Sequence, residues 1–188
     1  DGRMRIHSRQ AQETADFPID RVVPKTGPAW SLYPRGVAEG LRQRKLLTRG
    51  MDALVDSDVP WGSGLTSSAS FEIATGLALL TINNASMPPM ELAMLGVWAE
   101  HNYPGVPCGI MDQTISVLGQ QGHALLLDCR DHTSRQVPLD DPHLRVVIAN
   151  SNVKHDLVQG EYSARRNQCE VAVAHIQKRF PTVASLRD

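Results

Sequence analysis

A loop rich in glycine and serine is the strongest candidate for chemistry in this sequence. Residues 59–70 read Val-Pro-Trp-Gly-Ser-Gly-Leu-Thr-Ser-Ser-Ala-Ser and precede an apolar run from Phe71 to Leu80. Small and apolar residues at helical spacing predict a loop leading into a buried helix N-terminus, where unpaired N–H groups and the helix dipole favour a phosphate. The alternative is an ordinary loop with a serine N-cap. The loop is not a Walker A motif, because it lacks Gly-Lys-Ser or Gly-Lys-Thr.

Four residues in this loop explain why it suits an anion. Gly62 and Gly64 have no Cβ, so the backbone can approach a bound group closely. Ser67 and Ser68 carry hydroxyls that can donate to phosphate oxygens or bind a hard cation such as Mg²⁺.

Other candidate residues follow at wider spacing. Asp112 begins a predicted helix, where it could accept a proton from a hydroxyl nucleophile or only complement the helix dipole. Glu100 ends an apolar helix and could reach Mg²⁺ or simply lie exposed. Tyr162 could hydrogen-bond a sugar or lie on an amphipathic helix, and Trp30 with Tyr33 could form an aromatic wall or part of the core.

The elements that must position these residues follow from periodicity and turn residues. We expect strands at residues 3–10, 51–59, 123–129 and 144–149, the third of them buried. We expect helices at about 30–46, from the glycine-serine loop to Asn83, from Pro89 to His101, and at 110–118 and 162–179, with loops at 17–28 and 151–160. Strands and helices alternate irregularly, which favours the α+β class.

Composition excludes several kinds of protein. The chain has 188 residues, 41% hydrophobic and 21% charged, with a formal net charge of −1. This charge argues against binding to nucleic acid or an anionic membrane, and no apolar run is long enough to span a bilayer. Three widely spaced cysteines, Cys108, Cys129 and Cys169, indicate reduced thiols and a cytoplasmic location.

The order of these motifs resembles the galactokinases, within the GHMP family of small-molecule kinases. The similarity begins with the loop at 59–70 and continues through Ala99-Glu100-His101 and the block from Gly105 to Gln113. Later stretches that agree are residues 123–130 and 150–154, and Glu161-Tyr162 with residues 165–170. The resemblance covers most of the chain.

The resemblance implies a set of roles for individual residues. Asp112 matches the catalytic base for the sugar 1-hydroxyl, and Ser68 and Glu100 match the Mg²⁺-binding positions. Gly109, Asp112 and Tyr162 match positions that line the galactose site. ATP would be bound by Gly62, Ser63, Gly64, Leu65, Thr66, Ser67, Ser68 and Trp30. The implied partners are therefore small molecules, ATP and galactose, and the full-length protein is expected to be a monomer.

The resemblance also implies a two-domain GHMP-kinase-like architecture, incomplete at both ends. Residues 1–140 correspond to part of the N-terminal, ATP-binding domain, and residues 141–188 to the start of the C-terminal domain. The family's N-terminal sugar-binding motif and its C-terminal glycine-rich motif are not found in this sequence. We therefore expect an internal fragment that is inactive by itself.

Two other functions remain open from the sequence. An N-acetylgalactosamine kinase would differ in the room that its pocket leaves at the sugar C2. A galactokinase-like sensor would bind ATP and galactose and regulate transcription without turnover. Such sensors lack a Ser-Ala pair in the phosphate loop, whereas Ser68-Ala69 is present here, which favours an enzyme.

Overall fold

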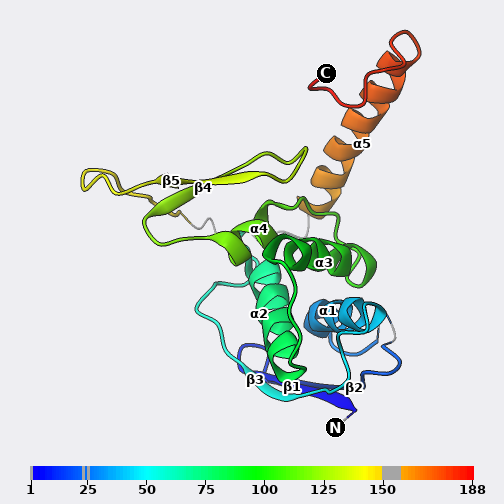
Figure 1. The fold of residues 1–188 in the computed structure, drawn as a ribbon, viewed down its shortest axis with the longest axis vertical. Helices are drawn as coiled ribbons and strands as arrows, with labels where there is room; N and C mark the ends of the chain where they lie inside the picture. Colours follow the sequence, from blue (N-terminus) through cyan, green and yellow to red (C-terminus); the bar gives the residue numbers. More distant parts are fainter. Residues whose placement is uncertain (1, 23, 25, 150–157) are drawn as a thin grey trace. The chain divides into compact units, whose positions relative to one another are not determined.

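The computed structural model describes residues 2–22, 24, 26–149 and 158–188 of the chain. The chain divides into two compact units, residues 1–150 and 151–188, which are described separately. The first unit is a mixed sheet and a group of helices followed by a β-hairpin, and the second contains one long helix (Figure 1). None of the described helices is long and apolar enough to cross a membrane.

The sheet of the first unit has the order β2-β1-β3. β1 (Arg3–Ser8) pairs antiparallel with β2 (Glu13–Pro18) and parallel with β3 (Asp52–Val55). Buried and exposed residues alternate strictly along β1, as expected for a strand with one face in the core. The predicted strands at 3–10 and 51–59 are therefore present but shorter. β2 was not predicted, and the loop expected at 17–28 starts only after Pro18, because Glu-Thr-Ala-Asp-Phe-Pro contains few apolar residues.

Four helices complete the packed part of the first unit. A short 3₁₀ helix, η1 (Ala29–Ser31), leads into α1 (Leu32–Gln43). α2 (Ser67–Ile82), α3 (Pro89–Asn102) and α4 (Met111–Leu118) follow, close to the predicted ranges. α1 contacts both α2 and α3, and α4 contacts the same two helices, so the four form one packed group.

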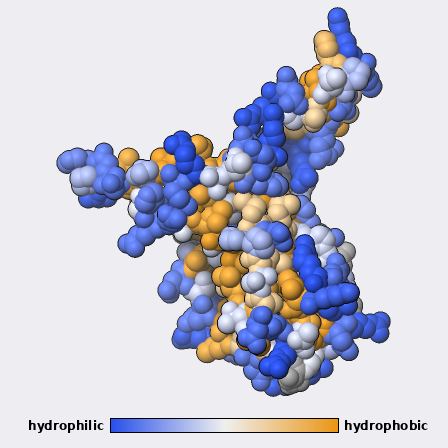
Figure 2. All heavy atoms as spheres, in the orientation of Figure 1, coloured by the Kyte–Doolittle hydropathy of each residue, from blue (hydrophilic) through white to orange (hydrophobic). Residues whose placement is uncertain are grey.

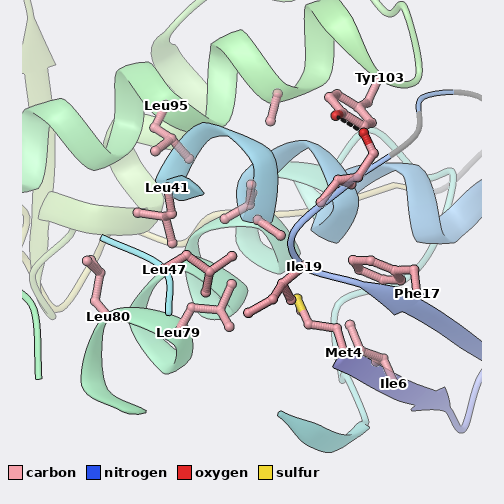
Figure 3. Packing of buried hydrophobic residues seen from close by; sticks show 14 of the residues in the cluster. Met4, Ile6, Phe17, Ile19, Leu41, Leu47, Leu79, Leu80, Leu95 and Tyr103 are labelled. Atoms are coloured by element: carbon pink, nitrogen blue, oxygen red, sulfur yellow. Dashed lines mark hydrogen bonds between the residues drawn. The ribbon is translucent and has the colours of Figure 1, made fainter. Parts of the chain in front are cut away.

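The hydrophobic core lies between the sheet and these helices. Figure 3 shows Met4, Ile6 and Phe17 from the sheet near Ile19, Leu41, Leu47 and Leu79. All seven side chains are buried, and most of them are fully buried. At the edge of the core, the Tyr103 hydroxyl donates a hydrogen bond of 3.1 Å to the Val22 carbonyl oxygen, shown dashed in Figure 3. Burial of these side chains fixes the helices on one face of the sheet.

After α4 the chain forms a two-stranded antiparallel hairpin, β4 (His123–Leu127) and β5 (Ser134–Pro138). The predicted strand at 123–129 is present, but the prediction that it is buried was wrong, because its residues are exposed or half-buried. Apolar side chains accordingly reach the surface over α2 and towards this hairpin (Figure 2).

The strand expected at 144–149 was a wrong prediction. These residues form no regular element, and Val146, Val147 and Ile148 are 74%, 85% and 65% exposed. An apolar run becomes a strand only when a neighbouring strand pairs with its backbone. None of the described residues pairs with this run. β5, which does find a partner, was not predicted, since Ser-Arg-Gln-Val-Pro is mostly polar.

The second unit contains α5 (Val158–Gln177) and a short C-terminal turn region. The helix was predicted to begin near residue 162, and it begins four residues earlier within the loop expected at 151–160. The remainder of that loop, residues 151–157, lies outside the described residues. An ion pair one helical turn apart joins Arg166 Nε to Glu170 Oε1 at 3.1 Å.

The close crossing of α1 and α3 makes a stability prediction. A Cβ added at Gly36 would lie 2.7 Å from Ala99 Cβ and 2.9 Å from Ala99 Cα, whereas one at Gly40 would meet side-chain atoms alone, Leu95 Cγ at 3.1 Å and Trp98 Cε3 at 3.4 Å. Both Gly→Ala changes gain the same helix propensity. We therefore expect Gly36→Ala to be less stable than the control Gly40→Ala by about 1–3 kcal/mol, because only the first forces two backbones apart. Urea unfolding measures the difference, and equal midpoints with equal slopes would contradict it.

Candidate functional site

The glycine-serine loop meets the start of α2 in an unusual backbone conformation. α2 begins at Ser67, and its N-cap residue Thr66 has a φ of 66°, in the left-handed region. Gly62 and Gly64 also have positive φ values, 67° and 72°, which glycine tolerates without steric cost. The N-cap makes no side-chain hydrogen bond to the helix. The alternative of a serine-capped loop is therefore not what the structure shows, and the first N–H groups of α2 have the character of an anion site.

A cavity of about 400 Å³ opens beside this helix start. Its lining combines aromatic surface with hydroxyls and one carboxylate. Trp30 and Phe71 lie with ring centroids 6.3 Å apart, and the Trp30 indole N–H donates to Glu13 Oε2 at 3.1 Å. The aromatic wall predicted from Trp30 and Tyr33 therefore faces a cavity. The lining residues used below are Trp30, Tyr33, Trp61, Gly62, Ser67 and Ser68.

Three of the predicted site residues come together at one end of this loop. The Ser68 hydroxyl, at the start of α2, is near enough to the Glu100 carboxylate, at the end of α3, to lower the pKa of that carboxyl group. Glu100 is only 5% exposed, and burial raises its pKa above the ordinary value. The charge of Asp112, in the first turn of α4, raises the same pKa further. A hydroxyl and two carboxylates from three helices thus share one region.

Two further residues of this region were missed by the sequence reasoning. The Gln113 side-chain amide donates to Glu100 Oε2 at 2.8 Å and to Glu72 Oε2 at 3.1 Å. Glu72 is fully buried, and desolvation followed by the charge of Glu100 raises its pKa to about 9. A signal was available, since Glu72 interrupts an apolar run on the helix face shared with Ala69 and Ile73.

Two neutral groups border the carboxylates. Burial, followed by the charge of Glu100, raises the pKa of Cys108 to about 12, and burial raises that of Tyr33 to about 12. The thiol therefore stays protonated at neutral pH, and its sulfur accepts a hydrogen bond of 3.7 Å from Gln113 Nε2. Neither group adds negative charge to a region that already holds three carboxyl groups.

The remaining predicted residues lie in different places. Gly109 is exposed in the loop before α4, three positions from Asp112. The same loop is fixed to α3 where the Cys108 backbone N–H donates to His101 Nε2 at 3.1 Å. Tyr162 is half-exposed on α5 in the second compact unit, so its role beside Asp112 stays a prediction.

Comparison with known proteins identifies the class of this domain. Residues 33–120 match the family model described as GHMP kinases N terminal domain. This segment, which includes nearly all of α1, the glycine-serine loop and α2 to α4, is similar to GHMP kinase N-terminal domains, and the chain has the GHMP kinase fold. Its structure also resembles a mevalonate kinase from Methanococcus jannaschii, with a TM-score of 0.52, 20% identity and coverage of 62% of this chain and 38% of that one.

Within this class, the chain has marked similarity to galactokinases. It is 45% identical to a galactokinase of Chloroflexus aggregans and 44% identical to one of Chloroflexus aurantiacus, over 98% of its own length. It covers 47% of each, so it spans about half the length of these curated relatives. The structure of Lactococcus lactis galactokinase complexed with galactose matches 95% of this chain and 47% of its own, with a TM-score of 0.79 and 28% identity.

The raised pKa of Glu72 predicts how stability depends on pH. The group binds its proton more tightly in the folded state, with a pKa near 9 against 4.5 for an ordinary glutamate. The contribution of this proton to the free energy of unfolding is therefore complete below the unfolded pKa. It is lost as the pH rises towards the folded pKa, so the free energy of unfolding falls by up to about 1.4 kcal/mol per pH unit. We expect the stability of Glu72→Gln to increase relative to wild type across this window, as measured by urea unfolding between about pH 5 and pH 8.

The matched control for this experiment is Glu91→Gln, which changes an exposed acid in the first turn of α3. This variant should keep the wild-type slope of stability against pH. A Glu72→Gln curve parallel to that of wild type would mean that Glu72 is ionised in the folded protein at neutral pH.

Proposed function

We propose that this chain provides the nucleotide- and metal-binding part of a galactokinase, which transfers the γ-phosphate of ATP to the 1-hydroxyl of D-galactose. One observation carries the proposal. The uncapped start of α2, its adjacent cavity and the grouped side chains of Ser68, Glu100 and Asp112 lie in one compact unit. The identity of 44–45% to galactokinases supports the choice of substrate class.

The glycine-serine loop would hold the triphosphate. Gly62 and Gly64, in left-handed conformations, let the backbone approach the phosphate oxygens, and the N–H groups of the first turn of α2, at Ser67 and Ser68, favour their negative charge. Trp30 lines the same cavity and would contact the adenine. The remaining loop residues that would surround the triphosphate are Ser63, Leu65 and Thr66.

Ser68 and Glu100 suit a hard divalent cation. They offer a hydroxyl and a carboxylate that lie near each other, and Mg²⁺ prefers oxygen ligands from one or two carboxylates together with phosphate oxygens. The cation, when bound, would supply positive charge to the phosphate oxygens during transfer. Its charge would also favour the ionised form of Glu100 against the cost of burial.

Asp112 would act as the base in the reaction. Its carboxylate takes the proton from the sugar 1-hydroxyl as that oxygen forms a bond to the γ-phosphorus, and the bond from this phosphorus to the β–γ bridging oxygen breaks, releasing ADP. Catalysis of this kind depends mainly on positioning and charge neutralisation. The loop and the three helix ends of the first unit supply both.

The galactose site and the domain organisation belong to the same proposal. Gly109 and Tyr162 would line the sugar pocket with Asp112. Residues 1–140 would form the N-terminal domain and residues 141–188 the beginning of the C-terminal domain of a monomeric enzyme. The three free cysteines among the described residues support a reducing compartment, such as the cytoplasm.

Asp112→Asn in the complete gene product tests the proposed base. The amide keeps the size of the side chain but cannot accept the proton, so we expect turnover with galactose to fall by about 10²–10⁴. A coupled assay of ADP release measures the rate. The control Asp140→Asn changes an exposed carboxylate outside the site and should leave the rate at the wild-type level.

The outcomes of this assay separate the possible functions. A rate for Asp112→Asn within about tenfold of wild type, equivalent to ~1.4 kcal/mol of barrier, would show that Asp112 is not the base. Faster turnover with N-acetylgalactosamine than with galactose would change the proposed substrate. Binding of ATP and galactose by the wild-type protein without ADP release would identify a sensor.

A further inference from the structure

A buried amide joins two acidic side chains behind the proposed metal site. Gln113 from α4 and Glu72 from α2 are both 0% exposed, and Glu100 from α3 is nearly as buried. We call Gln113 and Glu72 the amide clamp. Gln113 contacts the Glu100 carboxylate directly, and Ser68 lies near the same carboxylate.

In the clamp, the Gln113 side-chain nitrogen donates both of its hydrogens to carboxyl oxygens. A glutamine NH₂ group has two hydrogens to donate, and here Nε2 lies 2.8 Å from Glu100 Oε2 and 3.1 Å from Glu72 Oε2. Cys108 Sγ lies 3.7 Å from the same nitrogen. Because a carboxylate is planar, engaging one of its oxygens sets the direction of the other.

The clamp is costly to maintain as a purely structural feature. Glu72 Oε1 and Gln113 Oε1 are buried with no hydrogen-bond partner among the described residues. Each such atom costs about 1–3 kcal/mol, and well-packed apolar side chains would avoid that cost. The clamp also requires a glycine in α3, since a Cβ at Gly96 would lie 2.9 Å from Gln113 Cγ and 3.2 Å from Glu72 Oε2.

We propose that Gln113, held by Glu72, is a positioning residue that orients the Glu100 carboxylate and so sets how strongly a divalent cation strengthens nucleotide binding. The inference rests on the proposed function, because it takes Glu100 as a metal ligand. Side chains that hydrogen-bond a metal ligand commonly change metal affinity when they are replaced.

Nucleotide binding with and without metal tests the proposal in the complete gene product. The probe is a non-hydrolysable ATP analogue, and its affinity is measured by titration calorimetry with Mn²⁺ and then with EDTA. The metal enhancement is the ratio of these two affinities. We expect Gln113→Met, which keeps the length of the side chain but removes its hydrogen bonds, to lower the enhancement by about 10–100-fold. The metal-free affinity should stay unchanged, because Gln113 does not line the cavity.

A second variant separates positioning from folding. Glu72→Met removes the unpaired Glu72 oxygen but also one acceptor of the Gln113 amide, whereas Gln113→Met takes the donor from two acidic side chains, so thermal melting should show a smaller loss of stability for Glu72→Met. It also removes one of the anchors of Gln113, so the metal enhancement should still fall. The control Gln120→Met changes an exposed glutamine just after α4 and should keep the wild-type enhancement.

The possible results are decisive in either direction. A wild-type enhancement in Glu72→Met and in any folded Gln113→Met would overturn the positioning role, and so would a wild-type protein whose nucleotide affinity does not respond to Mn²⁺. If Gln113→Met does not fold, Glu72→Met alone decides. The metal enhancement could also follow the expected pattern in a protein that does not phosphorylate galactose. That result would refute the proposed reaction and support the positioning role of Gln113.

Discussion

The hydrogen bonds of the Gln113 amide are the interaction on which this site depends. They connect α4 to α2 through Glu72 and to α3 through Glu100, so three helices meet at one buried polar point. Burial makes these bonds stronger than they would be in water, and it also makes any misplaced partner costly. The helix ends that carry Ser68, Glu100 and Asp112 are therefore held in a fixed relation.

The same constraint explains the backbone around it. Gly96 leaves room for the clamp between α2 and α3, and Gly36 lets α1 approach α3 so closely that no further side chain fits. The chain enters α2 through a loop in which Gly62, Gly64 and Thr66 adopt left-handed conformations. The strain of Thr66, about 1–2 kcal/mol for a residue with a Cβ, stands at the point where a phosphate would bind.

Much of the fold could be predicted from the sequence, and the failures have physical causes. The helices could be predicted from regular apolar spacing and from stop signals such as Asn83, because both are local properties of the sequence. The prediction of a strand at 144–149 was wrong because strand pairing depends on a partner that is distant in the sequence. The strands β2 and β5 were missed because a strand that finds a partner can be mostly polar. Glu72 was missed because its role depends on Gln113, 41 residues away. The domain boundary near residue 140 stays a prediction.

The sequence by itself indicated the class of protein that this chain resembles, and it supplied the chemical groups of the candidate site. The order of the glycine-serine loop, Glu100 and Asp112 was enough to indicate a GHMP kinase, since each group belongs to a short local motif. Only the tertiary structure decided which groups lie together, that Gln113 bonds both Glu100 and Glu72, and that an uncharged Cys108 lies beside them. The physical reason is that desolvation and hydrogen bonding depend on neighbours that folding brings from other helices.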